Sequence, residues 1–176
     1  VTGVQTCALP ILIWTMAHRI YLLTALLISL SVIATPIGTE AQMRFTYHMI
    51  QHIACLMLVG PLLVLATPLE LRNRLNQNQV FNKLTNPWIS FILYLLMMVG
   101  VHLSPIHLYI MENYWIHYLV ELPMYLTIPY FFYFNLLDSQ LLNRRVSTGS
   151  ACLILWLMMV PETLTGFFIY ISKPSA

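Results

Sequence analysis

The chain has 176 residues, of which 59% are hydrophobic and 8% are charged. A soluble domain carries about 25% charged residues, so this composition excludes an ordinary soluble protein. The net charge of +2 is too small to indicate a nucleic-acid partner, and no basic run or aromatic stacking platform supports one. The apolar residues form blocks long enough to cross a bilayer, which predicts a polytopic helical membrane protein.

The first ten residues, VTGVQTCALP, resemble translated adapter read-through from metagenomic reading frames, and the chain does not begin with methionine. We therefore expect residues 1–10 to be a non-native or unstructured stretch. A single transmembrane helical domain is expected over residues 11–176. The chain is also expected to be a fragment at both ends.

Five apolar segments predict five membrane-spanning helices, and the expected fold class is an all-α transmembrane bundle. In chain order these spans cover residues 11–37, 45–69, 88–103, 114–137 and 148–171. About twenty residues, each rising about 1.5 Å, are enough to cross the hydrocarbon core. The polar segments between the spans, residues 38–44, 70–87, 104–113 and 138–147, are expected to be loops.

The lysines and arginines of these loops predict the orientation of the bundle. The loop after the second span holds Arg72, Arg74 and Lys83, and the loop after the fourth span holds Arg144 and Arg145. Cytoplasmic loops of membrane proteins are the richer in these residues, so both loops are expected on the cytoplasmic side. The other two loops then face outward.

Histidines gather at the outward end of this predicted bundle. His48 and His52 are one turn apart on one face of the second span, His102 ends the third span, and His117 opens the fourth. Polar side chains inside a membrane are costly and by default indicate function. Imidazole binds copper, zinc and iron, so these four histidines are the predicted metal ligands. His18 falls at the opposite face and is excluded.

Other metal-capable side chains are expected near the same depth. The further candidates are Cys55, Glu121, Met49, His107 and Glu162. Cys55 and Met49 would favour Cu(I), but buried cysteine and methionine also serve as ordinary packing. Glu121 remains open as a ligand, as a hydrogen-bond acceptor for a ligating histidine or as a proton carrier. His107 is equally expected as an ordinary loop residue, and Glu162 as a hydrogen-bonded side chain at a proline break.

Three blocks of the sequence resemble the CtaG-type cytochrome c oxidase assembly factors associated with caa-type oxidases. The blocks are YHMIQHIACLMLVGPLLVLATPL, VHLSPIHLYIMENYWIHYLVELPMYL and RRVSTGSACLILWLMMVPETLTGFFIYIS. Their order and spacing extend the resemblance over residues 46–172, and it assigns His48, His52, His102 and His117 to family positions. Glu121 stands where the family tends to have a histidine. The family usually has six or seven spans.

The resemblance implies a non-enzymatic role in maturing a haem–copper cytochrome c oxidase. It implies an integral protein of the bacterial cytoplasmic membrane that binds or delivers copper, as Cu(I), at the outer face. The oxidase subunits and the lipid bilayer are the implied partners. The identity of the metal, the client oxidase and the oligomeric state stay open.

Two other functions remain open from the residues alone. Two histidines on facing helices could hold haem b axially in a membrane electron carrier. A metal or proton transporter would need polar side chains toward the inner half of the spans, yet the second and fourth spans are apolar there. A di-iron hydroxylase would need several histidine boxes, whereas the chain has a single HxxxH pair.

Overall fold

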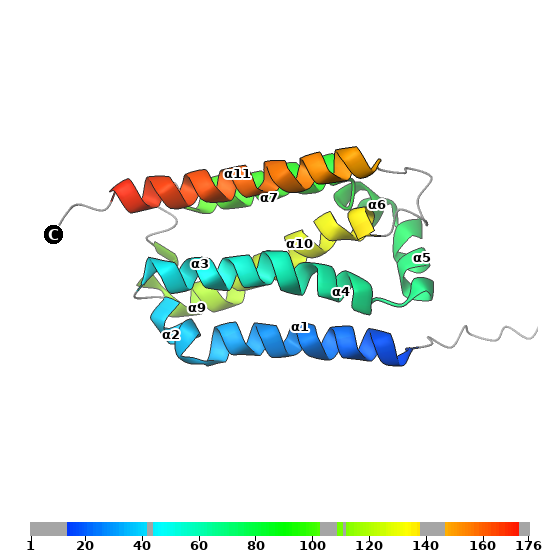
Figure 1. The fold of residues 1–176 in the computed structure, drawn as a ribbon, viewed down its shortest axis with the longest axis horizontal. Coiled ribbons are helices and arrows are strands. Elements are labelled where there is room, and N and C mark those ends of the chain that lie inside the picture. Colours follow the sequence, from blue (N-terminus) through cyan, green and yellow to red (C-terminus); the bar gives the residue numbers. More distant parts are fainter. Residues whose placement is uncertain (1–13, 42–43, 103–108, 111, 138–146, 173–176) are drawn as a thin grey trace, which may run out of the picture.

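The computed structural model describes residues 14–41, 44–102, 109–110, 112–137 and 147–172. Its regular elements in these ranges are all helices, so the predicted all-α fold class is confirmed. The bundle is elongated, with α1 (Met16–Ala34) along one side and α11 (Thr148–Ser172) along the other (Figure 1). Between them lie α3 (Phe45–Ile53), α4 (Gly60–Ala66) and α10 (Leu122–Leu137).

The first predicted span ends earlier than its apolar sequence suggests. Helix α1 stops at Ala34, and the short helix α2 (Pro36–Ala41) turns away from it within the expected span and loop. Pro36 has no N–H group, so it cannot donate to the carbonyl four residues before it, that of Val32. The side chain of Gln51 donates to this carbonyl instead, over 2.8 Å. A glutamine of the second span thus completes the end of the first.

The second span is one continuous run of helix from Phe45 to Ala66 with a π-helical segment in its middle. This segment, η1 (Ala54–Val59), joins α3 to α4, and the N–H of Gly60 bonds to the carbonyl of Cys55, five residues earlier. The ring of Pro61 would clash with the carbonyl of Met57 in a regular α-helix. The wider π turn accommodates this ring two residues after η1 ends.

Residues 70–87, predicted to be a polar loop, instead form two short helices, α5 (Leu69–Gln77) and α6 (Gln79–Leu84). Leucine, glutamate, arginine and glutamine all have good helix propensity, which outweighs the low hydrophobicity of the segment. The side chain of Asn78 caps α6 by accepting hydrogen bonds from the N–H groups of Val80 and Phe81, over 2.9 and 3.1 Å. The predicted loop is therefore wrong, because helix propensity and capping, which hydropathy does not measure, form two helices in this segment.

Helices also occupy the ranges predicted for the third, fourth and fifth spans. The third is α7 (Pro87–His102), and the fourth combines α9 (Tyr114–Ile116), η2 (His117–Glu121) and α10. The second π-helical segment, η2, also ends two residues before a proline, Pro123. The fifth is α11.

Three helical runs in the described residues are long and apolar enough to cross a membrane: Met16–Ala34, Phe45–Ala66 and Thr148–Phe168. The apolar helix α7 is shorter. The membrane character of the chain therefore stands, and the number of about five spans remains a prediction.

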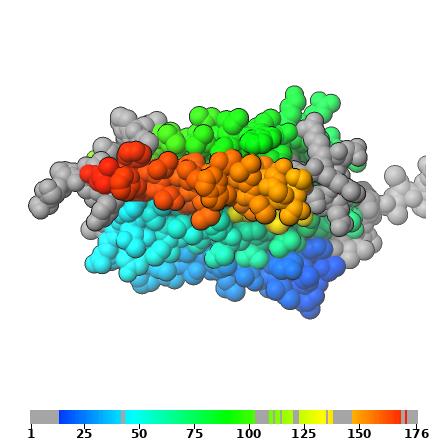
Figure 2. All heavy atoms as spheres, turned by 45° about the horizontal axis from the view of Figure 1, so that its top comes forward, coloured from blue at the N-terminus to red at the C-terminus, as the bar shows by residue number. Residues whose placement is uncertain are grey.

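The core lies where α4 packs against α1 and α10, and α7 against α10 and α11. Its largest fully buried apolar and aromatic side chains are Tyr94, Tyr125, Phe132, Phe134, Leu56, Met98 and Met158. Outward-facing side chains on the long helices are mostly apolar, as for Trp156 and Phe167, which suits contact with lipid. Figure 2 shows α11 lying along the surface between α7 and α3.

Candidate metal centre

The structure brings the four predicted histidines together inside the bundle. His48 and His52 come from α3, His102 is the last residue of α7, and His117 is the first residue of η2. None of these side chains is more than 4% exposed. The ring centroid of His48 lies 4.1 Å from that of His52, 5.9 Å from that of His102 and 5.8 Å from that of His117.

Three of the histidines present ligand atoms to a common point. One ring nitrogen each from His48, His52 and His102 lies within 4.8 Å of the others. Bonds between a metal and imidazole are about 2.0–2.1 Å long, as in zinc sites, so two ligating nitrogens stand at most about 4.2 Å apart. Small side-chain movements would therefore close these three around one ion. His117 lies beside this group, with its ring centroid 5.8 Å from that of His48.

Tyr125 on α10 ties two of these histidines together, and the sequence analysis missed it. Its ring is stacked on His52, with centroids 3.7 Å apart and planes inclined by 25°. Its hydroxyl lies 3.3 Å from Nε2 of His102 and donates to the sulfur of Met98 over 3.1 Å. The sequence feature that could have indicated Tyr125 is its spacing, because it follows His117 by eight residues, or two steps of four, along the same predicted span.

The other ring nitrogen of His102 is held by the backbone. Nδ1 of His102 lies 2.9 Å from the carbonyl oxygen of Met98 on the same helix. A donor–acceptor contact of this kind fixes the tautomer and the ring orientation, and leaves Nε2 to face Tyr125 and the other histidines. The sulfur and the carbonyl of Met98 thus both contribute to the surroundings of His102.

Both π-helical segments adjoin histidines of this group. His52 precedes η1 by two residues, and His117 begins η2. A π segment adds a residue to the helical repeat and is frequent at functional sites. A proline follows each segment by two residues, Pro61 after η1 and Pro123 after η2. Proline alone is not sufficient, because Pro129 and Pro161 lie inside regular α-helix.

The further candidate residues fall mostly outside the histidine group. Cys55 is completely buried and belongs to the apolar core. Met49 is half-buried, and its methyl end lies near Gly166 of α11. The backbone of Glu121 closes η2, but its side chain lies outside what the structure describes. His107 also lies outside the described residues.

Glu162 on α11 occupies a second polar position within the bundle. Its side chain is 7% exposed and lies near Tyr94 of α7 and Tyr133 of α10. It is not among the described side chains whose ligand atoms converge with His48, His52 and His102. The hydroxyl of Tyr133 also donates to the sulfur of Met57 over 3.6 Å. Polar groups therefore occur on α7, α10 and α11 beyond the histidines.

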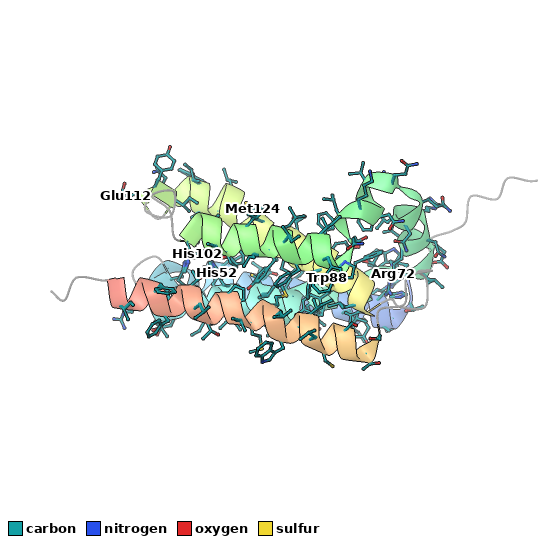
Figure 3. All side chains as sticks on the ribbon, turned by 90° about the horizontal axis from the view of Figure 1, so that it is seen from above. His52, Arg72, Trp88, His102, Glu112 and Met124 are labelled. Atoms are coloured by element: carbon teal, nitrogen blue, oxygen red, sulfur yellow. The ribbon has the colours of Figure 1, made fainter. Side chains whose placement is uncertain are left out.

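The histidine group sits near one end of the bundle. His52 and His102 lie toward the same end, whereas Arg72 and Trp88 lie toward the other (Figure 3). His18 lies in the first turn of α1, in a capping box with Thr15. That turn lies at the end of the bundle that holds α5 (Figure 1).

Comparison with known proteins identifies one family. The family model of the cytochrome c oxidase caa3 assembly factor (Caa3_CtaG) matches residues 6–176. Neither the curated proteins nor the solved structures compared with the chain include a match. The matched region contains all four histidines and both π-helical segments.

Proposed function

This chain belongs to the cytochrome c oxidase caa3 assembly factor family, and from that premise we propose that it binds copper as cargo for a haem–copper oxidase. The resemblance found in the sequence is confirmed by the family match. The proposed ligands are His48, His52 and His102, with His117 completing or exchanging with them. The role is one of acquisition and delivery rather than of catalysis.

The observation that carries this proposal is the convergence of three buried imidazoles from two helices. Side chains of this polarity are expensive within an apolar bundle, so their clustering needs a compensating function. Imidazole nitrogen is a suitable donor for copper, and a site of few ligands suits the Cu(I) state. A cargo site must also release its ion, which an incomplete ligand set favours.

The position of the group near a helix end fits a transfer role. His48 lies in the first turn of α3, and His102 is the last residue of α7. An ion held at that depth is close to the aqueous boundary, where it is received and passed on. The basic residues Arg72, Arg74 and Lys83 belong to α5 and α6, at the other end. The positive-inside rule thus supports placing the histidine end at the outer face of the bacterial cytoplasmic membrane.

The packing around the histidines favours a single ion over haem b. A haem needs a flat slot between its two axial histidines. Here the rings of His48, His52 and His102 pack against one another with centroids 4.1–5.9 Å apart, which leaves no such slot between any two of them. A Soret absorption band distinguishes the two functions directly, because haem has one and a copper carrier does not.

The proposed function is tested by complementation in a bacterium that has lost its own assembly factor of this family. The oxidase is purified after expression of the wild-type chain, of His52→Ala or of His18→Ala, and its copper-to-haem ratio is measured. We expect His52→Ala to lower this ratio, whereas His18→Ala, at the opposite end of the bundle, leaves it unchanged. An unchanged ratio with folded, membrane-inserted His52→Ala protein would contradict the proposal.

A further inference from the structure

A second, independent feature lies at the end of the bundle away from the histidines. A shallow pocket of about 240 Å³ opens where α6 meets the beginning of α7, and is lined by Gln79, Asn82, Lys83, Asn86 and Ile89. Trp88 lies at this end of the bundle, remote from His52 and His102 (Figure 3). The assembly role proposed for the histidines makes no use of this pocket.

The polar side of the pocket is rich in hydrogen-bond donors. Its described lining residues contribute the ammonium group of Lys83 and three amide side chains, and none of them carries a carboxylate. The Oδ1 atom of Asn86 already accepts a hydrogen bond from the N–H of Trp88, over 3.1 Å. Its remaining polar group is the NH₂ donor. A cation surrounded by amide donors is suited to an anion with several acceptor oxygens, and phosphate is such a group.

An apolar stripe of α7 begins at the same pocket. Ile89 lines the pocket, and Ile92, Leu96 and Val99 follow it at spacings of three, four and three residues, on one face of the helix. Their side chains are between 39% and 63% exposed. Trp88, which is 55% exposed, stands beside the start of the stripe. Tryptophan is enriched where a membrane protein meets the headgroup layer.

We propose that this corner binds an anionic phospholipid. Lys83 and the amide groups of Asn82 and Asn86 receive the phosphodiester, and an acyl chain lies along Ile89, Ile92 and Leu96. A free phosphate ion would use only the donors, and the pocket offers it one cation. A lipid uses both the donors and the apolar stripe. Because both features lie side by side, a phospholipid fits this corner better than a free phosphate ion.

The test uses the full chain, delipidated in detergent, and native mass spectrometry to count bound lipid. Short-chain phosphatidylglycerol and short-chain phosphatidylcholine are titrated separately onto wild-type protein, Lys83→Gln, Lys83→Arg and Arg74→Gln. Arg74→Gln is the matched control, because it removes a basic side chain from α5 that does not line the pocket. Both substituted positions, Lys83 and Arg74, are exposed, so the fold is not at risk.

We expect saturable binding of phosphatidylglycerol that Lys83→Gln weakens about fivefold, the factor corresponding to one basic residue near an anionic membrane surface. Lys83→Arg restores the binding, and Arg74→Gln leaves it within twofold, roughly the scatter expected for a screened, more distant charge. Equal weakening by Lys83→Gln and Arg74→Gln would overturn the site in favour of diffuse attraction. Displacement of the lipid by inorganic phosphate, or equal affinity for the two lipids, would overturn the anionic lipid as occupant.

Discussion

The aromatic ring of Tyr125 is stacked on the imidazole of His52, with ring centroids 3.7 Å apart. The same tyrosine reaches Nε2 of His102 with its hydroxyl, over 3.3 Å. One side chain of α10 therefore contacts a histidine of α3 and a histidine of α7. Tyr125 is fully buried and packs where these three helices meet at the site.

Tyr125→Phe separates the two contacts of this tyrosine. The phenylalanine ring keeps the stacking on His52 but removes the hydroxyl beside His102 and Met98. Nδ1 of His102 is held by the carbonyl of Met98, so Nε2 is the nitrogen left for an ion, and an ion bound there has to displace the hydroxyl of Tyr125. We expect the Cu(I) affinity in a competition titration to rise by up to about fivefold, the equivalent of one hydrogen bond of about 1 kcal/mol, and the free energy of unfolding to fall by about 1 kcal/mol.

Tyr125→Ala is the companion variant, because it also removes the ring and leaves a cavity. Replacing a buried aromatic side chain by alanine costs about 3–5 kcal/mol of stability, so this variant should melt far earlier than Tyr125→Phe. A Cu(I) affinity about tenfold lower in folded Tyr125→Phe would show that the hydroxyl supports the bound ion rather than competing with it.

Gln51→Leu tests the link between the first two spans. It keeps the approximate size of the side chain but removes the donor to the carbonyl of Val32, which Pro36 cannot supply. Hydrogen bonds between membrane helices contribute about 0.6 kcal/mol on average and up to about 1.7 kcal/mol. We expect a loss in this range in a denaturation measurement in detergent micelles. Gln77→Leu, at the exposed end of α5, is the matched control and should stay within about 0.5 kcal/mol of wild type.

Gly60→Ala tests the close approach of α4 and α10. A β-carbon at Gly60 would stand 2.7 Å from the β-carbon of Pro129 and 3.2 Å from a ring carbon of Tyr133. Such overpacking costs typically about 1–3 kcal/mol. Gly100→Ala on α7 is the contrast, since no atom of the described residues lies within 4 Å of its added carbon. Helix propensity predicts that Gly100→Ala is neutral or stabilises by up to about 1 kcal/mol. Equal effects of the two substitutions on thermal stability would contradict the close approach.

Cys55→Ala and Glu162→Gln test whether the ligand set extends beyond the imidazoles. Both side chains are buried, and neither belongs to the described group whose ligand atoms converge. We expect both variants to bind as much Cu(I) as wild type, as measured by metal analysis after desalting under reducing conditions. Loss of copper from either one would add a thiol or a carboxylate to the proposed site.

The helical periodicity of the sequence was enough to predict most of the histidine group. The spacing of His48 and His52, and the matching depth of His102 and His117, predict the group that the structure shows. Hydropathy and spacing act along single helices, so they could not reveal the contact of Tyr125 with His52 across two spans. Such contacts depend on how helices rotate against one another, and the π-helical segments change that rotation.

The departures from the predicted fold have local causes that hydropathy does not register. Pro36 ends α1 within an otherwise apolar segment, and Asn78 caps a helix in a stretch too polar to be predicted as a span. Both effects come from single backbone groups, a missing N–H in one case and a capped N–H in the other. The positions of Pro36 and Asn78 in the sequence indicate both the end of α1 and the start of α6.

The central claim is that the buried imidazoles hold copper, and the most direct test is anaerobic titration of the purified chain with Cu(I) against a chromophoric competitor. The wild type, the double variant His48→Ala/His52→Ala and the control His18→Ala are compared, and an absorption spectrum is recorded for each. The account predicts about one tightly bound Cu(I) per chain in the wild type and control, its loss in the double variant, and no Soret band. Full binding in the folded double variant, or a Soret band that the double variant loses, would contradict it.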